Sequence, residues 1–141
     1  MARPQFGLVL GHAKYFCVGR ANADKRESMD LENTQVQMRK GILEYCVLHI
    51  ISRGEIYASD MLDELTAAKM IVVEGTLYPL LTRLKNAGLL EYKWVESKSG
   101  PPRKYYKLTL DGRNFLEKLT ETWEGLIHST EMITSKSKAA S

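Results

Sequence analysis

Positively charged side chains gather in one short segment, and they are the residues best suited to chemistry. Between Gly75 and Leu108 the sequence has seven Lys and Arg residues against two Glu residues, a local net charge of +5 in a chain with +3 overall. Such a concentration is what a surface that faces nucleic-acid phosphates requires. The alternative is a solvated surface on which the cations only maintain solubility. The seven residues are Arg83, Lys85, Lys93, Lys98, Arg103, Lys104 and Lys107.

Hydroxyl groups lie beside these charges, near the start of a predicted helix. Thr76 and Tyr78 lie outside the apolar positions of this helix. Helices of this kind contact phosphates or base edges through their first turns. The structural alternative is that Thr76 caps the helix and Tyr78 packs its ring on a neighbour. We predict that both residues contact DNA.

The turn of a predicted hairpin is flanked by Lys98, Arg103 and Lys104, which reach an adjacent groove or backbone. Because phosphate contacts carry little sequence information, we expect these cations to contribute affinity rather than sequence choice. The predicted DNA-binding residues are therefore Thr76, Tyr78, Arg83, Lys98, Arg103 and Lys104, with Tyr57 and Ser59 at the first turn of the preceding helix.

The sequence lacks the spacings that catalysis or metal binding would need. Its histidines, His12, His49 and His128, are widely separated, and Glu44 with His49 does not make an HExxH spacing. The two cysteines are too few for a metal site or a disulfide framework, and Cys46 is expected to be a buried structural thiol. We expect no enzyme activity, no catalytic residue, no metal and no cofactor.

The composition is that of an ordinary globular protein. The chain has 141 residues, of which 44% are hydrophobic and 26% charged, enough for one small domain with a core. Its apolar runs are all shorter than the roughly 20 residues that span a bilayer. We therefore expect a cytoplasmic protein with no membrane partner.

Three predicted helices must position the charged segment. Apolar residues recur at steps of three and four from residue 34 until Gly54 ends the first helix, over about 58–69 in the second, and over about 74–87 in the third. Gly88 ends the third helix. Three short helices with tight connections predict a helix-turn-helix arrangement.

The apolar period then changes to that of strands. Residues 90–95 alternate, residues 97–102 are turn formers, and residues 103–108 alternate again, which predicts a β-hairpin. Trp94 is expected to be a core residue under the sheet. Three helices followed by a hairpin make a winged helix, so the fold class is mainly α with a small β-hairpin (α+β).

A long last helix is predicted over about 110–133, with Thr109 as its N-cap. Its apolar residues are spaced 3, 4, 3, an a/d seam that suits packing against a second copy of the chain. The predicted dimer-interface residues are Leu116, Leu119, Trp123 and Leu126.

The predicted organisation has four parts. Residues 1–30 form a poorly ordered N-terminal extension, for which the rival interpretation is a DNA-contacting arm. Residues 31–109 form a winged-helix DNA-binding domain, residues 110–134 a dimerisation helix, and residues 135–141 a polar tail.

Two linked motifs carry a family resemblance. The run from Gly75 to Pro79 (GTLYP), followed by Leu81, Arg83-Leu84 and Gly88-Leu-Leu90, resembles the recognition-helix signature of the PadR-like transcriptional regulators. The run Gly100–Thr109 (GPPRKYYKLT), with Gly112, is similar to that family's wing. The resemblance implies a homodimeric winged-helix regulator of the short-tailed subfamily, usually a repressor, that a small molecule or other signal releases from its operator.

Within that resemblance Trp123 has two interpretations. In some short-tailed PadR-like regulators a similarly placed Trp lines a pore at the dimer centre and sandwiches flat aromatic compounds, which implies a small aromatic effector here. The alternative is a tryptophan that only fills the dimer core. The function itself also has an alternative, a winged-helix module that binds a protein partner without DNA. The charge count favours double-stranded DNA as the partner.

Overall fold

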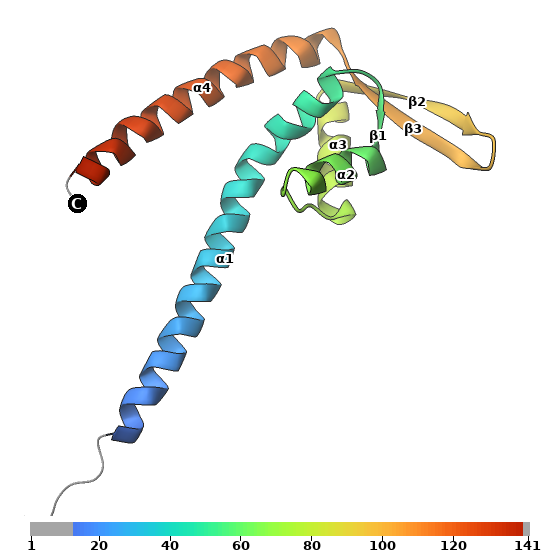
Figure 1. The fold of residues 1–141 in the computed structure, drawn as a ribbon. Coiled ribbons are helices and arrows are strands. Elements are labelled where there is room, and N and C mark those ends of the chain that lie inside the picture. The colour runs from blue at the N-terminus through green and yellow to red at the C-terminus, as the bar shows by residue number, and fades with distance from the viewer. Residues whose placement is uncertain (1–12, 140–141) are drawn as a thin grey trace, which may run out of the picture. The chain divides into compact units, whose positions relative to one another are not determined.

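The computed structural model describes the backbone of residues 13–139 and the side chains of residues 30–137 and 139. The chain divides into two compact units, residues 1–40 and residues 41–141, and each is described by itself. The elements, in chain order, are α1 (Ala13–Ser52), β1 (Ile56–Tyr57), α2 (Ala58–Ala67), α3 (Glu74–Asn86), β2 (Leu90–Ser97), β3 (Gly100–Leu108) and α4 (Leu110–Ala139) (Figure 1).

In the first unit, α1 begins at Ala13, well before the start predicted at residue 34. The sequence before about residue 31 shows no sustained apolar period, which is why it predicts a later start, and the described residues 30–41 are all exposed. Residues 1–12 of the predicted extension lie outside the described residues. The division into an extension and a winged-helix domain stays a prediction.

The core of the second unit lies where the end of α1, α2, α3 and the sheet meet. The apolar stripes predicted for the three helices are confirmed, because their central residues are almost fully buried. These residues include Val47, Ile51, Met61, Leu65, Leu77, Leu81 and Leu84. Leu48 is also fully buried, although it lies outside the predicted stripe of the first helix.

The sheet has three antiparallel strands in the order β1-β3-β2, so the predicted hairpin is confirmed and a short strand is added. β1 pairs only with Tyr105 and Tyr106 of β3. The predicted turn was too long, because β3 already begins at Gly100 and the turn is Lys98-Ser99. Pro101 and Pro102 lie where β1 does not extend alongside β3 and where the pairing of β3 with β2 is irregular, between Val95 and Ser97, so a ladder donor is not needed on either side.

Thr109 caps α4 as predicted, since its Oγ1 accepts a hydrogen bond from the backbone N–H of Gly112 at 3.0 Å. The same hydroxyl donates to the carbonyl oxygen of Gly88 at 2.7 Å, which joins the start of α4 to the end of α3. The helix extends to Ala139 rather than ending at Ile133, so the first residues of the predicted polar tail are helical.

Candidate nucleic-acid interface

The N-terminus of α3 presents polar groups to solvent. Its N-cap is Val73, which makes no side-chain capping hydrogen bond, and the backbone N–H groups of Thr76 and Leu77 bond to the Val73 carbonyl. Thr76 is thus not the cap, and it lies exposed beside the exposed Tyr78. The buried side of the helix is the predicted Leu stripe, so both predicted DNA-contacting residues of this turn face away from the core.

The structure divides the cations of the charged segment into two groups. Some are neutralised by carboxylates: Arg83 by Glu44 (2.6 Å), Lys93 by Glu55 (2.5 Å) and Lys107 by Glu91 (3.1 Å). The others have no acidic partner within the described residues, namely Lys85, Lys98, Arg103 and Lys104. The unpaired cations are the ones whose charge is available to a phosphate.

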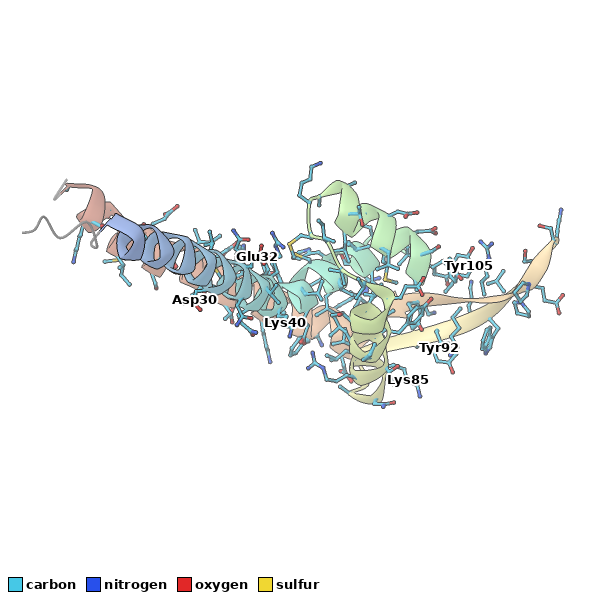
Figure 2. The ribbon with its side chains drawn as sticks, turned by 90° about the horizontal axis from the view of Figure 1, so that it is seen from below. Asp30, Glu32, Lys40, Lys85, Tyr92 and Tyr105 are labelled. Atoms are coloured by element: carbon cyan, nitrogen blue, oxygen red, sulfur yellow. The ribbon has the colours of Figure 1, made fainter. Side chains whose placement is uncertain are left out.

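Arg83 is therefore placed differently from the other predicted DNA-binding residues. Its guanidinium group donates to Glu44 near the end of α1, on the side of α3 that packs against that helix. A DNA contact by Arg83 would have to compete with this ion pair, so its predicted role stays a prediction. Lys85, two residues further along α3, is exposed and unpaired within the described part of the chain, and sequence reasoning counted its charge without selecting it (Figure 2).

Aromatic rings contact two of the three wing cations that the sequence selected, Arg103 and Lys104. The Arg103 guanidinium carbon lies 5.1 Å from the centre of the Tyr57 ring. The Lys104 Nζ lies 4.6 Å from the Tyr92 ring and 5.0 Å from the Trp94 ring. Each such contact stabilises an exposed cation by about 0.5–1 kcal/mol and leaves its charge in place. The rings thus orient these charges without neutralising them.

A pocket of about 180 Å³ lies between the start of α2, helix α3 and the wing. Its lining brings together four residues that the sequence predicted as DNA-binding and that lie far apart in the chain. The lining residues are Tyr57, Ala58, Tyr78, Trp94, Pro102, Arg103, Lys104 and Tyr106. Figure 2 labels Tyr92 and Tyr105 on the two strands of the wing beside it. Lys98 lies apart from the pocket, at the turn of the wing.

The phenol of Tyr78 ionises less readily than that of an ordinary tyrosine, because its pKa is raised. Burial raises its pKa above the ordinary value of 10.0, and the neighbouring Tyr57 and Glu74 raise it further. Burial likewise raises the pKa of Tyr106 at the floor of the pocket. Tyr78 is therefore a hydrogen-bond donor at neutral pH, suited to a phosphate oxygen or a base acceptor.

Trp94 is not the core residue that its alternation with Leu90 and Tyr92 predicted. Its side chain is 61% exposed, Tyr92 is 37% exposed, and only Leu90 on that face is buried. The reason is the length of the hairpin, which extends beyond α2 and α3, so the core covers only its base (Figure 1). Ser59, which the sequence predicted to contact DNA, is half-buried. Its Oγ lies 3.4 Å from the Asp60 carboxylate.

This arrangement of helices and wing matches a known family. The model of the transcriptional regulator PadR-like family matches residues 47–118, which span α2, α3, the sheet and the start of α4. The chain belongs to the PadR-like family of transcriptional regulators. Its fold is accordingly the winged helix-turn-helix that the two sequence motifs predicted.

Solved structures of PadR-like proteins resemble this chain closely. A PadR-like transcription factor from Bacteroides fragilis is 55% identical, with a TM-score of 0.62 over 72% of this chain and 98% of the other. A PadR family regulator from Eggerthella lenta is 32% identical, with a TM-score of 0.66 over 81% and 96% of the two chains. Bacillus subtilis PadR, solved in complex with operator DNA, is 21% identical over 56% of this chain and 46% of the other. Its TM-score of 0.52 shows a shared fold.

The residues predicted for the dimer and the effector lie along α4 of this PadR-like chain, in three different environments. Leu116 belongs to the core of its own domain and Leu119 packs on that core. Trp123 is half-buried, with its ring 5.7 Å from that of Tyr45 at the end of α1. Leu126 is 56% exposed. A dimer role for these residues, and a ligand role for Trp123, stay predictions.

Three further features of the described residues concern the thiol of Cys46, metal ligands and membrane-spanning helices. Cys46 is half-buried rather than buried, and desolvation raises the pKa of its thiol. Within the side chains that the structure describes, there is no group of His, Cys, Asp and Glu that would hold a metal ion. No helix between residues 13 and 139 is long and apolar enough to cross a membrane.

Proposed function

We propose that this chain is a homodimeric repressor that binds operator DNA through α3 and the wing and is released by a small aromatic effector. The observation that carries the DNA contact is the sorting of the cations. Of the four unpaired cations, Lys85 lies on α3, which also holds Tyr78, and Lys98, Arg103 and Lys104 lie on the turn and strand β3 of the wing, where Trp94 of β2 is the neighbour of Lys104. A repressor of this kind acts on chromosomal DNA, and this agrees with the predicted cytoplasmic location.

On DNA, α3 would lie in the major groove with Thr76, Tyr78 and Lys85 toward the duplex. The wing would place Lys98, Arg103 and Lys104 along the adjacent backbone, where they supply affinity. Bacillus subtilis PadR, which shares the fold, was solved in complex with operator DNA, and this supports DNA as the partner.

The outer part of α4 supports a dimer. Leu126, Ile127 and Ile133 are 56%, 38% and 71% exposed, an amount of apolar surface that a second copy would cover. Leu116 is already used by its own core, so the proposed seam runs from Leu119 outward. A two-fold dimer would read two half-sites about one helical turn apart.

The effector part of the proposal rests on Trp123 and Tyr45. Their rings are tilted by 34° and lie partly exposed, which offers stacking surface to a flat aromatic compound. The alternative, a Trp123 that only packs the dimer, predicts that aromatic compounds change neither its fluorescence nor DNA affinity.

The test is selection of binding sites from a random duplex library, followed by binding of the enriched duplex across a salt series. We expect strong enrichment and affinity that falls steeply with salt. The Arg103→Ala/Lys104→Ala variant should bind more weakly, with the slope of log K against log salt flattened by about 0.9 per lost phosphate contact. Glu91→Ala/Lys107→Ala is the matched control, since it removes both members of an ion pair on the wing and leaves the net charge unchanged.

A well-folded dimer that enriches no duplex would refute the DNA-binding proposal. That outcome would favour the alternative in which the winged helix binds a protein. Equal loss of affinity in Glu91→Ala/Lys107→Ala and in Arg103→Ala/Lys104→Ala would refute the assignment of the unpaired cations, while the DNA-binding function would stand.

A further inference from the structure

The exposed face of the wing carries an apolar surface that the fold itself does not use. Trp94 is 61% exposed, and the neighbouring Tyr92 meets it edge to face with ring centres 6.3 Å apart. Removing the exposed part of this tryptophan ring from water would be favourable, so the ring offers surface to a partner.

A cation lies on both rings. Lys104 pairs with Trp94 in the register of the hairpin, and its Nζ lies 5.0 Å from the Trp94 ring and 4.6 Å from the Tyr92 ring. Lys104 has no carboxylate partner within the described residues. The rings therefore restrict the lysine side chain to one region and leave its charge for an anion.

The same face of the wing adjoins α3. Trp94, Lys104 and Tyr78 line one pocket, whose floor is Tyr106. The opposite face of the wing carries Lys93 and Lys107, which pair with carboxylates, and Arg103, which lies over the Tyr57 ring. An anionic partner that contacts Tyr78 thus meets the face with Trp94 and an unpaired lysine.

We infer that Trp94 and Lys104 together bind one nucleotide unit of duplex DNA, with Lys104 on the phosphate and the Trp94 ring against the deoxyribose. This inference rests on the proposed function and adds a residue to its contact surface. Sugar and phosphate are adjacent in every nucleotide. On this surface the apolar ring of Trp94 likewise lies beside the unpaired cation of Lys104. Trp94 would supply affinity for any sequence, because the sugar is the same in all of them.

The first test compares affinities of variants of the full chain for the selected duplex. Trp94→Ala should weaken binding by about tenfold, the factor that corresponds to 1.4 kcal/mol, and Trp94→Phe should retain most of the affinity. The slope of log K against log salt should not change in Trp94→Ala, because no charge is removed. Lys104→Ala should make this slope shallower by about 1 for each contact of Lys104 with a phosphate that is lost. Val95→Ala, one residue away on the opposite face, is the matched control and should bind within about twofold of the wild type.

The second test observes Trp94 itself. The chain has two tryptophans, so the difference between the emission of the wild type and that of Trp94→Phe reports Trp94. Its emission should change on titration with the duplex and follow the same isotherm as fluorescence anisotropy of the labelled DNA. A merely structural role of Trp94 would change stability and leave this titration signal absent.

The outcomes separate the inference from the function. DNA binding with wild-type affinity in Trp94→Ala and constant Trp94 emission would overturn the inference and leave the proposed function standing. Equal weakening in Trp94→Ala and Val95→Ala would also overturn it, since that result indicates a disturbed wing. If the wild-type chain enriches no duplex at all, the proposed function fails first and the inference fails with it.

Discussion

Gly112, in the first turn of α4, lies closer to neighbouring backbone than any side chain would allow. A Cβ built there would overlap the carbonyl oxygen of Leu89 and lie 3.0 Å from its carbonyl carbon and 3.2 Å from Leu108 Cδ2. Ordinary carbon–carbon contacts are about 3.5–4.0 Å, so Gly112→Ala must displace this backbone. Leu89 cannot move freely, because its N–H bonds to Leu84 and its carbonyl accepts from the N–H of Thr109.

The expected cost follows from these contacts. Overpacking costs about 1–3 kcal/mol, and losing the hydrogen bond between Leu89 and Thr109 costs about 1 kcal/mol. Alanine in place of glycine in a helix returns about 1 kcal/mol. We therefore expect Gly112→Ala to lower the free energy of unfolding by about 1–3 kcal/mol.

Gly125→Ala in the same helix is the matched control. A Cβ at Gly125 meets nothing within 4 Å, so this variant should be stabilised by up to about 1 kcal/mol. Urea unfolding followed by circular dichroism, at one fixed protein concentration, measures both variants. If Gly112→Ala is as stable as Gly125→Ala, the packing of α4 on Leu89 is not as described and the reasoning is refuted.

Three further variants test other contacts. Lys69 has a positive φ of 62° after α2, so Lys69→Gly should raise the free energy of unfolding by about 1 kcal/mol, whereas Lys69→Ala should not; equal effects would contradict this explanation. Thr109→Ala removes the cap of α4 and the bond to Gly88, and should lower the unfolding free energy by about 1–2 kcal/mol in urea unfolding; an unchanged midpoint would contradict the capping role. The raised pKa of Tyr106 means that its ionisation disfavours folding, so stability is unaffected below pH 10 and decreases above it. Tyr106→Phe should lose less stability than the wild type when pH is raised from about 9 to 11, and parallel losses would refute this cause.

Much of the fold was predictable because it depends on local patterns. The apolar stripes of α2 and α3 recur at helical spacing, and their central residues, such as Met61 and Leu81, are buried as expected. Thr109 was recognisable as a cap because capping involves residues within one turn. Helix α1 begins earlier than predicted, at Ala13, because the sequence before about residue 31 shows no sustained apolar period from which a helix could be predicted.

The interface was predictable in its charge and not in its contacts. The sequence showed that residues 75–108 are basic, whereas only the structure showed that Glu44 neutralises Arg83 and that Lys104 stays unpaired within the described chain. Glu44 is far from Arg83 in the chain, and no periodicity links the two residues.

By itself, the sequence determined the order of helices and hairpin, the local stops and caps, and the family. The tertiary structure alone decided which apolar residues are covered: Leu48 is buried, and Trp94 is exposed. The alternation of apolar and polar residues specifies on which face of a strand each side chain lies. Burial depends on how far the core extends along that face, and the hairpin extends beyond α2 and α3 (Figure 1).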